Sequence, residues 1–170
     1  MTISTPNKIK RNSGRPTHDQ SQQLTVAILD VTRKSLVKRG FQDTNVQQLA
    51  ADCGITRRSI SSRFKSRDDL LIALVKHDIE AFKPHLQEMV IRDSHTWEDL
   101  ELICRRLWKR GFDIQESALL RAYLGETARL PELAHVIRDF YYYMNETLEG
   151  LITQAQGFGM FRNFKASTVA

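Results

Sequence analysis

Cysteine is scarce in this sequence, which argues against protein classes that depend on disulfide bonds or on cysteine-bound zinc. The 170 residues include two cysteines, Cys53 and Cys104, whose spacing matches neither a disulfide framework nor a zinc module. Long hydrophobic runs are also missing, because no stretch approaches the roughly 18 apolar residues of a membrane span, and no apolar segment follows the polar, basic N-terminus. These absences argue against a membrane span and a secretory signal, so we expect a cytoplasmic protein.

Motifs of the common catalytic classes are missing too. The sequence contains no GxSxG, HExxH, GxGxxG or P-loop pattern, and therefore gives no support for an enzyme or a bound cofactor. His77 and His85 come nearest to a metal-ligand pair, but their spacing places them about 80° apart on a helix, and Pro84 intervenes. We predict no metal site, no cofactor and no catalytic residue.

Charge is distributed unevenly along the chain. The formal net charge is +5, yet residues 1–70 carry 13 basic and 6 acidic side chains, whereas residues 71–170 carry 12 and 14. This asymmetry indicates a module that binds a polyanion, joined to a module with another task. The composition, with 41% hydrophobic and 26% charged residues, is that of a folded protein and excludes wholesale disorder.

Helical signals cover the chain beyond its first residues. Residues 1–16 are basic and polar without apolar periodicity, and are predicted to form a flexible arm. Pro84 is expected to kink or break the helix that contains it, and no run alternates with period two. Capping residues and stop glycines predict an all-α fold with helices over 17–39, 46–52, 57–64, from 66 onward, 96–111, 113–130 and 131–155.

The residues between Val46 and Phe64 have the spacing of a helix-turn-helix. Ala50 is followed by Gly54 four residues later and by Ile60 six residues after that. Two short helices that meet at a steep angle need a small residue at their contact, a glycine in the turn and an inward apolar residue. In a helix-turn-helix the second helix enters the major groove of DNA, so this spacing predicts DNA binding.

Exposed side chains of the predicted second helix are of types that read base edges, because arginine can bind guanine with two hydrogen bonds and serine can bond several bases. The predicted base-facing residues are Arg57, Arg58, Ser59, Ser61 and Ser62, behind a cap at Thr56. The predicted phosphate contacts are Thr44, Asn45, Arg63, Lys65 and Arg67. Lys8, Lys10, Arg11 and Arg15 form a candidate minor-groove arm.

This region resembles the tetracycline-repressor (TetR) family of bacterial transcription regulators. The resemblance covers about 58 residues from Gly14 to Leu71, and its order of elements includes Gly40-Phe41, Thr44, Ala50, Gly54, Ile55-Thr56, Phe64 and Ser66-Arg67. It implies a three-helix DNA-binding domain, here 17–65, and a helical domain, here 66–170. The resemblance further implies that this second domain dimerises and usually binds a small effector.

Two positions depart from the family pattern. The family commonly has a tyrosine, then a histidine or tyrosine, where this sequence has Ser61 and Arg63. An aromatic phosphate contact is therefore absent, and Arg63 is expected to replace it electrostatically. We expect an unusual operator preference rather than a loss of DNA binding.

The helix predicted over 131–155 has a long apolar stripe, and its start resembles a segment that helps form the dimer bundle in one branch of the family. Pairing two such helices about a two-fold axis predicts a dimer interface, although a core helix within one chain is the alternative. Three consecutive tyrosines, Tyr141 to Tyr143, spread over about 200° of the helix, so at least one should meet a partner, a ligand or solvent. The predicted interface residues are Leu133, Ile137, Phe140, Met144, Leu148 and Leu151.

An effector pocket between helices of the second domain has its own candidate residues, for which ordinary core packing is the alternative. They are Phe82, Trp97, Cys104, Trp108 and Tyr123. The sequence thus predicts a homodimeric, sequence-specific transcriptional regulator, a repressor that a small-molecule effector releases from a double-stranded operator. The alternatives are a dimeric DNA-binding protein without an effector, and a helical ligand-binding protein that does not bind DNA.

Overall fold

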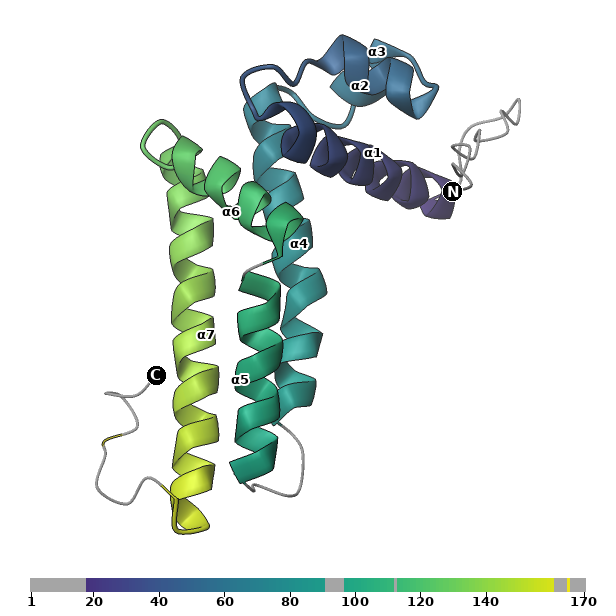
Figure 1. Ribbon diagram of the computed structural model, residues 1–170. Helices are drawn as coiled ribbons and strands as arrows, with labels where there is room; N and C mark the ends of the chain where they lie inside the picture. The colour runs from purple at the N-terminus through teal and green to yellow at the C-terminus, as the bar shows by residue number, and fades with distance from the viewer. Residues whose placement is uncertain (1–17, 91–96, 112, 161–164, 166–170) are drawn as a thin grey trace, which may run out of the picture. The chain divides into compact units, whose positions relative to one another are not determined.

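The computed structural model describes residues 18–90, 97–111, 113–160 and 165, and all regular structure within these ranges is helical (Figure 1). The predicted all-α class is therefore confirmed. The chain divides into two compact units, residues 1–74 and 75–170. One long helix, α4 (Arg67–Val90), begins in the first unit and continues into the second.

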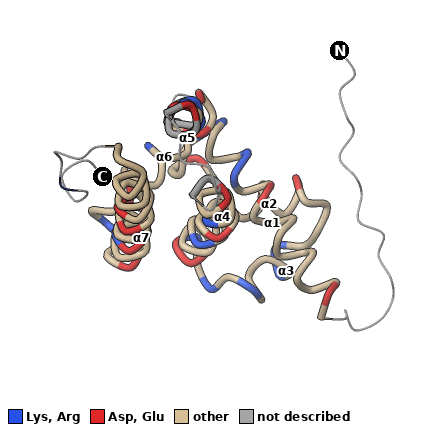
Figure 2. Tube along the Cα trace, turned by 90° about the horizontal axis from the view of Figure 1, so that it is seen from below, with Lys and Arg blue, Asp and Glu red and all other residues tan. Residues whose placement is uncertain are grey.

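The first unit is built from α1 (His18–Arg39), α2 (Val46–Cys53), α3 (Arg57–Ser61) and the first turns of α4. Its core consists of aliphatic side chains that are almost completely buried, among them Ile28, Leu49, Ile60, Leu70 and Leu74. Burying one such side chain stabilises a fold by about 1.5–3 kcal/mol. Lys and Arg positions lie along α3 and along the segment that joins it to α4 (Figure 2).

The stops at Gly40 and Gly54 and the cap at Thr56 lie where the sequence predicts them, and the structure adds a cap at Asn45. Gly40 ends α1 and Gly54 ends α2, both with a left-handed backbone, at φ of 76° and 67°. Asn45 accepts a hydrogen bond from the Gln48 N–H at 2.8 Å, and Thr56 accepts one from the Ser59 N–H at 3.2 Å. These side chains satisfy N–H groups that the first turn of a helix leaves without a partner, and so fix where α2 and α3 begin.

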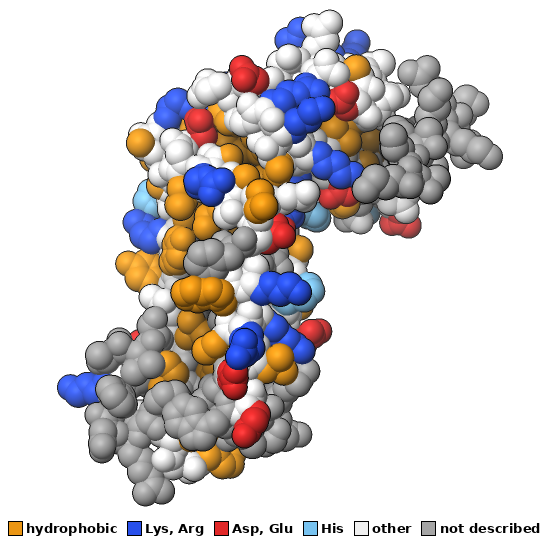
Figure 3. All heavy atoms as spheres, in the orientation of Figure 1, with side chains coloured by type: hydrophobic (Ala, Val, Ile, Leu, Met, Phe, Trp, Pro, Cys, Tyr) orange, Lys and Arg blue, Asp and Glu red, His pale blue; other side chains and the backbone are white. Residues whose placement is uncertain are grey.

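The second unit contains the rest of α4, then α5 (Trp97–Gly111), α6 (Ile114–Glu126) and α7 (Pro131–Gly157). The three longer helices α4, α5 and α7 run side by side, and α6 lies across one end of them (Figure 1). Hydrophobic side chains also reach the surface of this unit (Figure 3).

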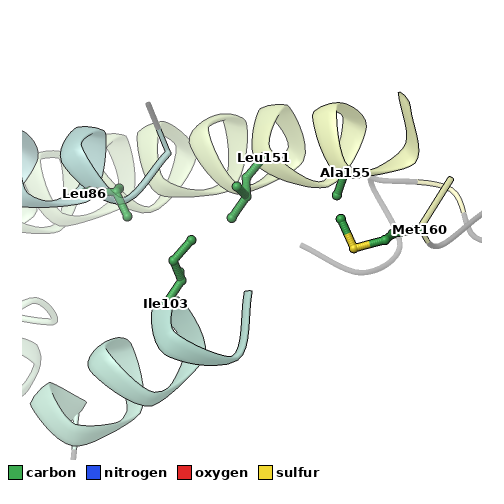
Figure 4. Close-up of a cluster of buried hydrophobic side chains, with 5 residues drawn as sticks. All are labelled: Leu86, Ile103, Leu151, Ala155 and Met160. Carbon is green, nitrogen blue, oxygen red and sulfur yellow. The ribbon is translucent and has the colours of Figure 1, made fainter. Parts of the chain in front are cut away.

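A cluster of buried apolar side chains holds the three longer helices together. Leu86 of α4, Ile103 of α5, and Leu151 and Ala155 of α7 point toward one another, with Met160 beyond the end of α7 (Figure 4). Phe82, Tyr143 and Met144 are partly buried and pack against this cluster. Because the cluster draws on three helices, it gives the second unit a core of its own.

A turn separates the end of α6 from Pro131, the first residue of α7. Asp113 caps α6 as predicted, but the helix ends at Glu126 rather than near Leu130. The N–H groups of Arg129 and Leu130 both donate to the Glu126 carbonyl, which closes a turn. Leu130 is extended, as expected for a residue that precedes proline, and Pro131 opens α7 in its first turn.

Pro84 does not end α4, contrary to one of the two outcomes expected from the sequence. The ring removes one main-chain hydrogen bond, yet the helix continues to Val90. Two side-chain bonds flank the position: His85 Nδ1 donates to the Ala81 carbonyl at 2.9 Å, and Lys83 Nζ pairs with Glu80 Oε1 at 2.6 Å. Phe82 and Leu86, on either side of the proline, pack in the same cluster, which keeps α4 helical through this point.

Substitution of two glycines that have open space around them distinguishes the effect of backbone strain from the effect of packing. A Cβ atom at Gly54 or at Gly150 would meet nothing within 4 Å, but only Gly54 has a left-handed φ. We expect Gly54→Ala to lower the free energy of unfolding by about 1–2 kcal/mol. Gly150→Ala should raise it by about 0.5–1 kcal/mol, because the residue is inside a helix. Urea denaturation of both variants measures the difference, and equal effects of the same sign would contradict this account.

Candidate nucleic-acid interface

The contact between α2 and α3 has the geometry that the sequence spacing predicts. Ala50 and Ile60 are 4% and 1% exposed, so the small residue and the inward apolar residue are both buried. The Ile55 N–H donates to the Ala50 carbonyl at 2.9 Å, and the left-handed Gly54 turns the chain between the helices. Buried contacts on one side of α3 thus hold the two helices of the helix-turn-helix together, and the opposite side of α3 remains at the surface.

The outer face of α3 and the residues that follow it are basic and polar. Arg57, Arg58, Ser61, Ser62 and Lys65 are exposed, in contrast to the buried Ile60 and Phe64. Residues 57, 58, 61 and 62 share one side of a helix, because four residues bring the chain almost once around its axis. The structure therefore brings most of the predicted base-facing set together on one face.

Ser59 and Thr56 bond to each other at the start of α3, where Thr56 is exposed and caps the helix. Ser59 is half-buried, and its hydroxyl lies 2.9 Å from Thr56 Oγ1. Its carbonyl accepts hydrogen bonds from Ser62 Oγ at 3.1 Å and from an Arg63 terminal nitrogen at 2.9 Å. Both residues thus help to form the ends of α3.

Thr44, expected to contact a phosphate, has a buried side chain. Its hydroxyl donates to the Gly40 carbonyl at 2.8 Å and lies 3.2 Å from Ser35 Oγ, while its N–H donates to the Phe41 carbonyl. These bonds close the turn between α1 and α2 from inside. The role of Ser35 was missed from the sequence, although a serine on the buried stripe of a helix indicates an internal polar partner.

Arg67, also expected to contact a phosphate, bonds within the first unit. One terminal nitrogen donates to the carbonyls of Gln42 and Thr44, both at 3.2 Å. The guanidinium carbon lies 4.3 Å from the centre of the Phe41 ring, within reach of a cation–π interaction. Arg67 therefore ties the start of α4 to the turn between α1 and α2.

Other predicted DNA contacts fall outside this set or outside the described residues. Asn45 is exposed, and its side chain caps α2. Nothing is described for the candidate arm residues Lys8, Lys10, Arg11 and Arg15, which precede residue 18.

The five candidate pocket residues of the second unit do not share one environment. Tyr123 is buried and donates to Asp78 Oδ2 at 2.6 Å, which joins α6 to α4. Phe82 packs edge-on against Phe140, with ring centres 5.8 Å apart. Cys104 and Trp108 are exposed, Trp108 to 70%. The side chain of Trp97 lies outside the described residues.

Half of the residues predicted for a dimer interface are buried inside their own chain. Leu133, Ile137 and Leu151 are buried, with Leu133 completely so. Phe140, Met144 and Leu148 are half-buried. Three of the six therefore pack in the chain's own core, as the alternative of a core helix within one chain predicts. Of the consecutive tyrosines, Tyr141 and Tyr142 are 42% and 61% exposed, and the hydroxyl of Tyr143 is buried.

Other chemical groups give no sign of a different kind of site in the described parts of the chain. No group of three His, Cys, Asp or Glu residues is placed there to hold a metal ion. Burial, with Asp52 adjacent, raises the pKa of the Cys53 thiol above its ordinary value, which favours the unreactive protonated form. Within the same ranges, no helix is both long enough and apolar enough to cross a membrane.

Comparisons with known proteins show what a helix-turn-helix followed by a helical unit resembles in this chain. Residues 28–74 match the model of the bacterial regulatory proteins of the tetR family. No curated protein matches the chain in a sequence comparison. The N-terminal unit therefore carries the tetR-family sequence pattern, and the predicted resemblance is confirmed.

Solved structures extend the likeness to the fold of the whole chain. A protein described as a TetR-family transcriptional regulator from Mesorhizobium loti is similar with a TM-score of 0.79 and 15% identity, over 90% of this chain and 77% of that one. A TetR transcription regulator from Haloarcula marismortui gives 0.77 and 20%, over 87% and 78%. A protein described as a transcriptional regulator from Saccharomonospora viridis, in complex with choline, gives 0.76 and 19%, over 87% and 78%. The chain has the fold of these regulators.

Proposed function

We propose that the protein is a cytoplasmic, homodimeric transcriptional repressor that binds a double-stranded operator and is released by a small-molecule effector. The observation that carries the proposal is the exposed face of α3, with Arg57, Arg58 and Ser61 on a helix whose opposite side is buried through Ile60. Recognition helices of this motif read base edges in the major groove with such side chains.

DNA contacts divide into base-reading and positioning groups. Arg57, Arg58, Ser61 and Ser62 would face the bases, and the exposed Lys65 would bind a phosphate beside the groove. The basic residues of 8–15 would enter the adjacent minor groove. The net positive charge of residues 1–70 supports this arrangement, because phosphate neutralisation supplies much of the affinity of such proteins.

An effector would act through the second unit. One structurally similar protein is in complex with choline, which supports a small-molecule site in proteins of this fold. In this chain the Asp78–Tyr123 pair and the Phe82–Phe140 contact place a carboxylate and aromatic rings between helices of the second unit. Since α4 belongs to both units, it would carry a change in the second unit to the first, with Pro84 as a hinge.

Dimerisation would use the exposed side of α7 rather than its buried stripe. Tyr141 and Tyr142 place large, partly apolar side chains at the surface of this helix. Aromatic residues of this kind are enriched at interfaces between proteins, where they bury a large area at little cost in conformational entropy. A two-fold axis beside α7 would bring the same two tyrosines of a second copy opposite them.

Replacement of one of these tyrosines by a charged residue tests the dimer surface. We expect Tyr142→Glu to raise the dimer dissociation constant by about tenfold or more, since an unpaired charge would be buried. Light scattering over a dilution series measures the change. Gln87→Glu, at an exposed position of α4, adds the same charge and should leave the constant unaltered. A Tyr142→Glu protein that dimerises as tightly as the wild type would contradict this surface.

DNA binding is tested by selection from random duplexes, followed by titration of the preferred site at several salt concentrations. The expected result is a palindromic site with a slope of log affinity on log salt of about −5 to −9, which corresponds to about 6–10 phosphate contacts. Arg57→Ala and Arg58→Ala should each reduce discrimination between bases by about 1–3 kcal/mol. The control is Arg106→Ala, which removes an exposed arginine from α5.

Two outcomes would contradict the operator proposal. A flat salt dependence without a preferred site would favour a helical ligand-binding protein that does not bind DNA. Selection of a site whose base preferences are the same in the Arg57 and Arg58 variants would place the reading residues elsewhere.

A further inference from the structure

Arg63 lies two residues beyond the end of α3, and its side chain turns back toward α3 and α1. One terminal nitrogen donates to the Ser59 carbonyl at 2.9 Å, and the other donates to Ser21 Oγ at 3.4 Å. The Nε atom is buried and has no hydrogen-bond partner among the described residues. The guanidinium group therefore bridges the last turn of α3 and the first turns of α1, which are 42 residues apart in sequence.

Both acceptors of this bridge are suited to a guanidinium group. The Ser59 carbonyl is among the last of α3, where main-chain acceptors lack helical partners and a positive charge is favoured. Ser21 lies in the first turns of α1, whose helical backbone positions its hydroxyl, and its carbonyl accepts a hydrogen bond from Thr25 Oγ1. The planar fork of arginine can bond two acceptors at once, which the ammonium group of lysine does far less well.

A short recognition helix depends on such contacts for its orientation. The helix α3 has five residues, too few to be stable without its neighbours. Ile60 and Phe64 anchor it from beneath, and Arg63 ties its end to α1. A small rotation of α3 would move Arg57 and Arg58 relative to base edges without breaking its buried contacts.

We infer that Arg63 is a positioning residue that sets the orientation of the recognition helix on α1, and that it is not a phosphate ligand. The inference rests on the proposed DNA-binding function. Arg63 then affects which sequence is preferred, acting through Arg57 and Arg58, more than it affects attraction to DNA of any sequence. Lys65, which is exposed two residues later, is the phosphate contact of this segment.

Charge-conserving substitution distinguishes the two roles. A phosphate ligand would tolerate Arg63→Lys, because lysine binds phosphate as a point charge. A positioning residue would not, so we expect Arg63→Lys to lower affinity for the selected operator by about tenfold, with random-duplex affinity within about twofold of wild type. The salt slope should stay the same, whereas Lys65→Met should make it less steep by about one.

A second variant tests the bridge from its other end. Ser21→Ala removes only the acceptor on α1 and should lower operator affinity by about threefold. The double variant Arg63→Lys/Ser21→Ala should bind no more weakly than Arg63→Lys alone, since both changes break one interaction. Thermal melts of all variants identify any loss of folded protein, and Ser21→Ala keeps the test valid where Arg63→Lys destabilises the domain.

The outcomes separate this inference from the function on which it rests. Wild-type protein without salt-dependent DNA affinity would overturn the proposed function itself. Operator binding by the wild type, together with full affinity of Arg63→Lys or additive losses in the double variant, would overturn only the positioning role. Unequal losses on operator and random DNA, at an unchanged salt slope, are the result that the geometry predicts.

Discussion

Burial of Ile60 is the constraint on which the proposed DNA-reading surface depends. With this residue 1% exposed, the side of α3 that faces the core is determined, and the positions on its other side must face outward. Ala50 allows the close approach of α2, and Gly54 provides the left-handed turn that leads into α3. Three apolar or small residues thus determine where Arg57 and Arg58 are displayed, although none of the three would touch DNA.

The four arginines between positions 57 and 67 divide into two groups that composition does not distinguish. Arg57 and Arg58 are exposed, whereas Arg63 and Arg67 bond main-chain carbonyls inside the unit. The basic character of this segment therefore serves stability as well as attraction to a polyanion. The guanidinium groups of Arg63 and Arg67 each join elements that are distant in sequence. Burial of aliphatic side chains alone does not fix the orientation of these elements relative to one another.

Local signals in the sequence were sufficient to predict most helix boundaries and the helix-turn-helix. The caps at Asn45, Thr56 and Asp113 each involve residues within three positions, so their patterns are visible without tertiary information. Thr44 and Arg63 could not be placed in this way, because each also contacts a serine of α1, Ser35 and Ser21 respectively, that lies far from it in sequence. Periodicity likewise identifies the apolar stripe of α7, but it does not say whether the same chain or a second copy covers Leu133.

The central claim, that the outer face of α3 meets DNA, is tested most directly by amide chemical shifts of the ¹⁵N-labelled protein titrated with a short mixed-sequence duplex at low salt. The account predicts that the largest changes fall between Asn45 and Lys65, centred on Arg57 to Ser62. Changes confined to residues beyond 75, or none under conditions where basic proteins bind any duplex, would contradict it.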